Sequence, residues 1–272
     1  DRPIDENLDL LLFRSINGRP LGSVVRFSAH VIAAGHCPVR QYSADFPGVL
    51  RKLIQLHFGG ICLSINGPCG DITLFEQIPF QFPQPVKEPQ PQGPLNMPHL
   101  KEKDTWKEVQ RIGQSLYNPL AKADNISFEP IEEMSFVEKE LNLPMRKDLV
   151  DLETAEKFYQ EHYTTFLELV NSKASLRTIK QEADLCRFYT HHKDFSGCWR
   201  YLWPDDLERK KVRCFVSSLQ INHIVIAGLP GEVFMETGET VRQAVEQNGT
   251  QCITATECNG DIGYIPTPDD IP

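Results

Sequence analysis

Ile221-Asn-His-Ile-Val-Ile-Ala-Gly-Leu-Pro-Gly-Glu232 is the stretch around which the rest of the chain is organised. Its residues as far as Leu229 are uncharged and rich in β-branched side chains, which is typical of a strand buried on both faces. Pro230-Gly231 ends that strand, and apolar residues then recur from Val233 to Val245 at the period of a surface helix. Glu232 is therefore predicted at the carboxyl end of a buried strand, where open α/β sheets bind ligands and where the following helix favours a carboxylate.

Composition and charge narrow the class of protein. The chain has 272 residues, of which 40% are hydrophobic and 24% charged, an ordinary globular composition with enough apolar material for one or two domains. The net charge of −9, without a basic run, argues against a nucleic-acid partner. No apolar run is long enough to be a transmembrane segment. The first residues lack the character of a signal peptide, although a processed chain would look the same.

The eight cysteines bear on the compartment. None forms a Cys-x-x-Cys pair, and Cys62, Cys214 and Cys252 lie in apolar predicted strands, where a free thiol behaves as a small hydrophobic group. We therefore expect reduced cysteines, which favours a cytoplasmic protein. An even number of cysteines is equally compatible with disulfides in a secreted chain, and the sequence does not decide between them.

The first 75 residues predict the order strand, strand, helix, strand. Asn17-Gly18 is a strong signal for a hairpin turn between the first two strands, and Asp45 stands where a helix N-cap belongs. Asn66 to Thr73 is a glycine-punctuated turn that follows the third strand. The predicted elements are strands at 8–13 and 22–30, a helix from Phe46 to Leu56 and a strand at 61–65.

The rest of the chain predicts helices first and strands later. Residues 79–99 are rich in Pro and Gln, and we expect them to form a loop near the site mouth or at an oligomer contact. We predict one α/β domain over residues 1–272, with a mixed β-sheet and helices packed on its faces. Its further elements are helices at 106–122, 151–172 and 176–186, a strand followed by an acidic linker within 125–144, a loop at 191–206, and strands at 212–220, 221–229 and 251–256.

Four segments, in this order, resemble the neutral/alkaline non-lysosomal ceramidase family. Each lies at the end of a predicted strand or in the turn or loop that follows one, and together they span most of the chain, with the weakest resemblance between Gln81 and Lys210. They are Phe27-Ser-Ala-His30; Ser43-Ala-Asp-Phe-Pro-Gly48 with the turn from Asn66 to Thr73; Gly228-Leu-Pro-Gly-Glu232; and Asn259 to Thr267.

The resemblance implies a zinc-dependent amidohydrolase. Members of the family split the fatty-acyl amide of ceramide, a sphingolipid, and hold their metal with two histidines, a glutamate and a tyrosine. On this chain His30 matches the second histidine, Glu232 the glutamate and Tyr264 the tyrosine, while Thr73 stands where the family has a serine. The family's first histidine lies upstream of the segment matched by His30, so we expect the chain to be truncated at both ends relative to the family.

The chemistry of such a site follows from its residue types. Imidazole and carboxylate suit Zn²⁺, which acidifies a bound water and polarises an amide carbonyl. Tyr264 is predicted either to bind the metal or to donate a hydrogen bond to the developing oxyanion. Thr73 and Asp71, in the glycine turn, are predicted to position the substrate or the attacking water. Asp45 either orients His30 or caps its own helix.

Structural interpretations of the same residues stay open. A histidine at a strand end is often only hydrogen-bonded, Glu232 suits any helix N-terminus, Tyr264 suits a core, and Asp71 and Thr73 suit an ordinary turn. The first hypothesis is a zinc hydrolase acting on a small-molecule or lipid amide, such as an N-acyl lipid. The alternative is a non-catalytic binding or scaffold module of the same fold with an incomplete metal site. A hydrolase of carbohydrate amides or esters is a third possibility, and an oligomer is compatible with each.

Overall fold

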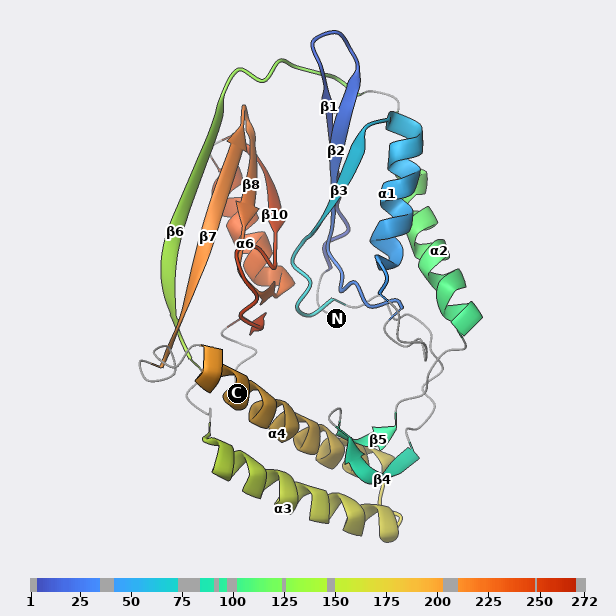
Figure 1. The fold of residues 1–272 in the computed structure, drawn as a ribbon, viewed down its shortest axis with the longest axis vertical. Helices are drawn as coiled ribbons and strands as arrows, with labels where there is room; N and C mark the ends of the chain where they lie inside the picture. The colour runs from blue at the N-terminus through green and yellow to red at the C-terminus, as the bar shows by residue number, and fades with distance from the viewer. Residues whose placement is uncertain are drawn as a thin grey trace. The chain divides into compact units, whose positions relative to one another are not determined.

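The structure is a computed structural model that describes residues 4–34, 42–72, 84–90, 93–96, 102–123, 126–145, 150–202, 210–247 and 249–267 (Figure 1). Contacts divide the chain into two compact units. The first comprises Asp1–Gln77, His99–Leu141 and Cys214–Pro272, and the second comprises Ile78–Pro98 and Asn142–Arg213. The single domain expected for residues 1–272 stays a prediction, because contact density does not test whether the units fold separately.

A three-stranded mixed sheet with helices on one face forms the first part of unit one. Strands β1 (Leu8–Arg14), β2 (Pro20–Phe27) and β3 (Ile61–Asn66) lie in the order β1-β2-β3, with β1 antiparallel and β3 parallel to β2. Helix α1 (Asp45–Phe58) connects β2 to β3, buries Leu50 and Ile54 against Val25 and Cys62, and packs against α2 (Glu102–Leu120). The hairpin predicted at Asn17-Gly18 and the helix predicted from Phe46 are confirmed.

A four-stranded mixed sheet forms the second part of unit one, except for residues 142–144 and 211–213 at the ends of two of its strands, which are assigned to unit two. Its strands are β6 (Met134–Pro144), β7 (Lys211–Ile221), β8 (Ile224–Gly228) and β10 (Gln251–Ala255), in the order β10-β8-β7-β6. The hairpin of β7 and β8 is antiparallel, whereas β8 and β10 are parallel and joined through α6 (Met235–Glu246), which contacts both strands. Two short parallel strands, β9 (Glu232–Val233) and β11 (Tyr264–Ile265), pair with each other. The prediction of an α/β fold with mixed sheets is confirmed.

A helical hairpin dominates the second unit. Helices α3 (Leu152–Asn171) and α4 (Leu176–Leu202) pack together around a buried cluster that includes Phe166 and Cys186. The Asp151 carboxylate accepts a hydrogen bond of 2.8 Å from the Thr154 N–H and so caps α3. Strands β4 (Gln84–Gln90) and β5 (Gly93–Asn96) form an antiparallel pair, and β5 contacts α4.

Three predictions about secondary structure differ from the structure. Within 125–144 the predicted order is wrong, because the irregular part comes first and the acidic part is strand β6, whose side chains are mostly exposed and so carry no apolar alternation. The loop predicted from residue 191 is wrong as far as Leu202, where α4 ends. Part of the loop predicted at 79–99 forms the β4–β5 pair. No helix in the described part of the chain is long and apolar enough to cross a membrane.

Candidate functional site

The carboxyl ends of two parallel strand pairs meet inside unit one. The Thr256 N–H, just after β10, donates to the Asn66 carbonyl at the end of β3 over 2.8 Å. The Thr256 hydroxyl donates to the Gly67 carbonyl over 2.7 Å, and the Gly67 N–H donates to the Phe27 carbonyl at the end of β2 over 2.9 Å. On the other side, the Leu229 N–H after β8 donates to the Ala255 carbonyl over 2.8 Å. Side chains that follow these four strands are therefore held in one region.

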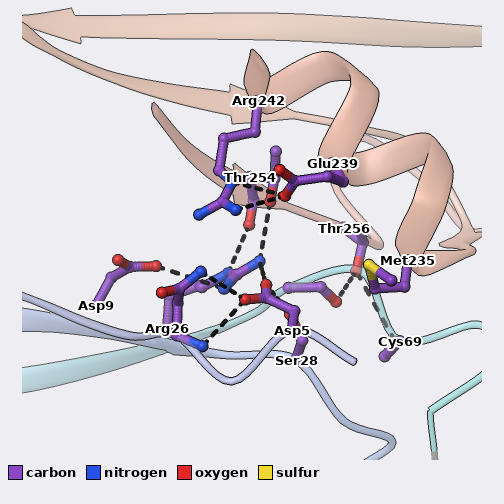
Figure 2. Close-up of polar contacts among 12 residues, drawn as sticks. Asp5, Asp9, Arg26, Ser28, Cys69, Met235, Glu239, Arg242, Thr254 and Thr256 are labelled. Atoms are coloured by element: carbon purple, nitrogen blue, oxygen red, sulfur yellow. Dashed lines mark hydrogen bonds and ion pairs between the residues drawn. The ribbon is translucent and has the colours of Figure 1, made fainter. Parts of the chain in front are cut away.

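A buried arginine, Arg26, links strand β2 of the three-stranded sheet to strand β10 of the four-stranded sheet (Figure 2). Arg26 is 2% exposed, and its guanidinium donates to the Thr254 carbonyl over 3.1 Å and to the Thr254 hydroxyl over 3.0 Å. It also forms ion pairs with Asp5 at 2.5 Å and with Asp9 at 3.4 Å. A buried charge is tolerated only when it is paired and hydrogen-bonded, and this one is both. We call Arg26, Asp5, Asp9 and Thr254 the arginine network.

The arginine network also lowers the pKa of the Asp5 carboxyl. Burial by itself raises the pKa of Asp5, but the hydrogen bond and the charge of Arg26 lower it. Hydrogen bonds from the Asn7 N–H and from the Ser28 hydroxyl, the latter at 2.9 Å, act in the same direction. The net result is a pKa below the ordinary value, so the charged form of Asp5 stabilises the folded state.

His30, Glu232 and Tyr264 lie together although they are far apart in sequence. His30 Nδ1 and Glu232 Oε2 are 3.4 Å apart, and the two side chains are 18% and 19% exposed. The Tyr264 hydroxyl is hydrogen-bonded to the Glu232 carboxylate. The rings of Tyr264 and His30 meet edge to face with centroids 6.0 Å apart. We call these three residues the His30–Glu232–Tyr264 group.

Backbone pairing fixes the three side chains relative to each other. In the parallel pair of β9 and β11, Tyr264 is the register partner of Glu232, whose N–H donates to the Gly263 carbonyl over 2.9 Å. The His30 N–H donates to the Ile72 carbonyl over 3.0 Å, and the Gly70 N–H donates to the Val233 carbonyl over 3.0 Å. The turn after β3 is thus bonded both to the segment of His30 and to the segment of Glu232.

Two glycines allow this close approach. A Cβ at Gly70 would lie 2.4 Å from the Glu232 carbonyl oxygen and 2.7 Å from the Phe234 ring. Gly231, just before Glu232, has a left-handed φ of 61°, and a Cβ there would lie 2.4 Å from the Gly263 carbonyl oxygen. Side chains at either position would collide with backbone, so these turns require glycine.

The electrostatics around Glu232 differ from those around Asp5. Burial is the largest influence on the Glu232 carboxyl and raises its pKa, and the carboxylates of Asp261 and Glu257 raise it further. The charge of His30 and the Tyr264 hydrogen bond lower it without offsetting the rise. The net pKa of Glu232 lies above the ordinary value, so its surroundings favour the neutral carboxyl, and a cation bound beside it would favour the ionised form.

The donor set fits part of a zinc site. A charge-assisted hydrogen bond between an imidazole and a carboxylate is about 2.7–2.9 Å long, whereas His30 and Glu232 are 3.4 Å apart. Two donors that each lie ~2.0–2.2 Å from one tetrahedral Zn²⁺ are roughly 3.4 Å from each other. Among the residues that the structure describes, no group of three or more His, Cys, Asp or Glu side chains is suited to a metal. The described chain therefore offers one imidazole, one carboxylate and a phenol.

Asp71 and Asp45 have structural contacts in this region. The Met235 N–H donates to Asp71 Oδ1 over 2.9 Å, so Asp71 caps helix α6, whose own N-cap residue provides no side-chain bond. Asp45 accepts 2.6 Å hydrogen bonds from the N–H groups of Phe46 and Ala34, so it satisfies one N–H group of the first turn of α1 and fixes the segment after His30. The N-cap position predicted for Asp45 is occupied by Ala44, and Asp45 is the first residue of the helix. Catalytic roles for Asp71 and Thr73 stay predictions, and Thr73 lies outside the described residues.

Asn66 and Glu257 are site residues that the sequence analysis did not select. The Asn66 carboxamide nitrogen donates to Glu257 Oε2 over 3.0 Å and to Cys69 Sγ over 3.2 Å. Glu257 lies two residues after the end of strand β10, and Glu232 lies after β8 and its Pro-Gly turn. Placement shortly after a strand end is the signal that would have found Glu257. Both residues are built on strand ends that the backbone bonds bring together.

Cys69 lies in the same region but has the wrong chemistry for a nucleophile. Its side chain is 0% exposed. Burial, followed by the charges of Glu257, Glu232 and Asp71, raises the pKa of the Cys69 thiol to about 12. The thiol is therefore protonated at neutral pH and unreactive. The cysteines whose state the structure describes are free, namely Cys62, Cys69, Cys186, Cys214, Cys252 and Cys258.

Comparison with known proteins gives a distant likeness. No protein-family model matches the sequence, and no curated protein matches it. Neutral ceramidase from Pseudomonas aeruginosa is 13% identical, with 97% of this chain and 41% of that chain covered at a TM-score of 0.49. A ceramidase complexed with C2 is 12% identical, with 97% of this chain and 43% of that chain covered at a TM-score of 0.48. The chain spans less than half the length of either protein, and the likeness by itself assigns no activity.

Proposed function

We propose that this chain carries part of the active site of a zinc-dependent hydrolase that cleaves an amide bond. His30, Glu232 and Tyr264 would be three of the metal's ligands. The observation that carries the proposal is the 3.4 Å separation of His30 Nδ1 and Glu232 Oε2, with the Tyr264 hydroxyl on the same carboxylate. The ligand set is the one that the sequence motifs imply, and the side chains come from three separate strand ends.

The residues of the group have distinct parts in this proposal. Zinc, when bound, supplies a Lewis acid for the amide carbonyl and an acidified water. His30 would present Nδ1 to the metal, and Glu232 would present Oε2. Tyr264, whose hydroxyl is now on Glu232, has a donor that can turn to the substrate oxygen, where negative charge develops during attack. Gly70 and Gly231 keep the backbone close enough for all three.

The substrate class is the finer part of the proposal. We infer an N-acyl lipid of the ceramide type from the motifs around His30, Glu232 and Tyr264, since these motifs resemble the ceramidase family. A small-molecule amide is the simpler substrate of the same chemistry. A panel of N-acyl sphingosines, N-acyl amino acids and short fluorogenic amides would separate these substrates by relative kcat/KM.

Metal analysis tests the proposal directly. We expect near-stoichiometric zinc in the purified full-length natural protein and at least a tenfold loss of bound zinc in His30→Ala and Glu232→Ala. His57→Ala is the matched control, because His57 is bonded to Tyr117 over 2.7 Å at the junction of α1 and α2 and takes no part in the group. Wild-type protein that stays free of zinc after incubation with the metal would contradict the proposal.

The second candidate is a non-catalytic binding module. The observation that favours it is that the described residues include only two conventional zinc ligands in the group, His30 and Glu232. A module of this kind would bind zinc weakly or not at all and would hydrolyse none of the amides in the panel. Stoichiometric zinc together with turnover of any amide would exclude it.

A further inference from the structure

Glu257 is held in an unusual conformation beside the proposed site. Its φ is 57°, in the left-handed region that residues other than Gly, Asn and Asp rarely adopt. The Glu257 N–H donates over 2.9 Å to the carbonyl of Gly231, the residue before Glu232. Backbone strain of this kind costs about 1–3 kcal/mol and is found mainly where function requires it. The conformation directs attention to what the side chain does.

The side chain is fixed at one oxygen only. The Asn66 carboxamide donates to Glu257 Oε2 over 3.0 Å, and none of the described contacts engages Oε1. The residue is exposed, so water reaches the carboxylate. Its charge acts on Glu232 and on Cys69, since it raises the pKa of both. Glu257 is therefore a positioned carboxylate, open to solvent and within electrostatic reach of the proposed metal ligand.

Amide hydrolysis needs such a group. The attacking water must lose a proton, and the departing nitrogen must gain one, because an amide anion is too basic to leave. The side chains of His30, Glu232 and Tyr264 are engaged with one another. Asp71 caps α6, and the Cys69 thiol is buried. Asp261, whose Oδ1 accepts a hydrogen bond of 2.8 Å from the Gly263 N–H, is held only within its own turn. The Glu257 carboxylate is oriented by the Asn66 side chain, so Glu257 is the better positioned of these two carboxylates.

We propose that Glu257 is the proton carrier of this site and that Asn66 is its positioning residue. The inference rests on the proposed function. Glu257 Oε1 takes a proton from the water as the water oxygen bonds to the carbonyl carbon. The C–N bond then breaks with its electron pair on nitrogen, and nitrogen receives the proton from Glu257. A carboxylic acid and an amine leave, and Glu257 is a carboxylate again.

The nature of the leaving group tests the role of Glu257. An activated phenol can leave as an anion, without being protonated, whereas an amine must be protonated before it leaves. Two fluorogenic probes share one acyl chain, an N-acyl aminocoumarin amide and the matching umbelliferyl ester. For Glu257→Gln in the zinc-loaded protein we expect amide kcat/KM to fall about 10²- to 10⁴-fold and ester kcat/KM to fall by a smaller factor, because the ester needs only the first of the two proton transfers. Asn66→Ala should show a smaller loss with the same selectivity, and Glu257→Asp should recover part of the amide activity.

Controls separate a chemical role from a structural one. Glu236→Gln is the control, because Glu236 is also exposed but lies on helix α6, and this variant should leave kcat/KM for both probes unchanged. Zinc content and the thermal midpoint of Glu257→Gln should equal those of the wild type, since Glu257 is not proposed as a ligand.

The outcomes distinguish this inference from the proposed function. An active wild type whose amide-to-ester ratio is unchanged in Glu257→Gln overturns the role of Glu257 alone. Equal losses on both probes, or loss of zinc from Glu257→Gln, also overturn it, because they indicate a structural or metal-binding role. A zinc-loaded wild type that cleaves neither probe and no amide of the panel overturns the proposed function and this inference together.

Discussion

The arginine network and the His30–Glu232–Tyr264 group lie on neighbouring strand ends of the same unit, yet they shift the pKa of their carboxyl groups in opposite directions. Arg26 is 2% exposed, donates hydrogen bonds to Thr254 and forms an ion pair with Asp5. The pKa of Asp5 lies below its ordinary value. Glu232 is half-buried, the His30 imidazole lies 3.4 Å from its carboxylate, and the pKa of Glu232 lies above its ordinary value.

This is the difference that we expect between a structural polar cluster and the group that we propose to be functional. A network whose charges are satisfied stabilises the fold and has nothing left to offer a ligand. A carboxylate whose charge is under-compensated lowers stability and retains affinity for a cation. Four substitutions test this contrast, in order of decreasing expected effect.

Removing the arginine should have the largest effect on stability. Arg26→Met leaves Asp5 and Thr254 buried without their partner, and we expect a loss of about 3–5 kcal/mol in the free energy of unfolding. Urea denaturation measures the loss. Arg111→Met, at an exposed arginine paired with Glu108 on α2, should cost less than ~1 kcal/mol. Equal losses in the two variants would mean that the network is not the structural element described.

Filling the space at Gly70 should disturb the site as well as the fold. Gly70→Ala places a Cβ 2.4 Å from the Glu232 carbonyl oxygen, and we expect a loss of about 1–3 kcal/mol together with weaker zinc binding. Gly18→Ala is the control, since its φ of 80° makes alanine strained while nothing lies within 4 Å of the new Cβ. Zinc retained in Gly70→Ala would argue that the turn does not position Glu232.

Asp5→Asn should destabilise the protein in a pH-dependent manner. The pKa of Asp5 is lower in the folded state than its ordinary value of 3.8, so its stabilisation is present above that value and is lost as the pH falls through the folded pKa. We expect a loss of about 1–2 kcal/mol near pH 7, and this loss should diminish in acid. Urea titrations from pH 7 to pH 3 measure it, and a loss that stays constant with pH would point to packing rather than charge.

Glu232→Gln should have the smallest effect, with the opposite sign. The raised pKa means that the folded state favours the protonated carboxyl. The cost to stability is therefore fully present above the raised pKa, declines as the pH falls below it, and disappears below the ordinary value of 4.5. In metal-free protein with a chelator, we expect Glu232→Gln to be more stable than the wild type by up to ~1 kcal/mol near pH 7, with no difference in acid. A destabilised variant at neutral pH would place Glu232 with the structural cluster.

Local signals in the sequence were sufficient for most of the fold. Asn17-Gly18 determines a hairpin by its own backbone preferences, and the β-branched run before Pro230-Gly231 is a strand in any context. Strand β6 was missed because an edge strand with exposed faces has no apolar alternation, and α6 starts at Met235 because Glu232-Val233 pairs with a segment 32 positions later. Such pairing depends on the tertiary fold and leaves no mark in the local pattern.

The residues of the candidate site also fall into those that local sequence signals select and those that depend on the tertiary fold. Residues that end predicted strands, namely His30 and Glu232, were found because the end of a buried strand is a recognisable place, and Tyr264 was found through its motif. Asn66, Glu257 and Arg26 were not selected, since their importance depends on partners nearly 200 or more positions away, such as the Asn66–Glu257 hydrogen bond and the Arg26–Thr254 contact. The cap that Asp71 provides to α6 belongs to the same class.

The pairing of β9 with β11 involves only Glu232 with Tyr264 and Val233 with Ile265. A slip of one position would put Gly263 opposite Glu232 and carry the phenol away from the carboxylate. In evolutionary terms, the connection between Glu257 and Gly263 should tolerate changes of composition at 258–262 better than any change of length. Among natural variants of this protein, single-residue insertions or deletions there should be the rarest kind of change, even where substitutions are common.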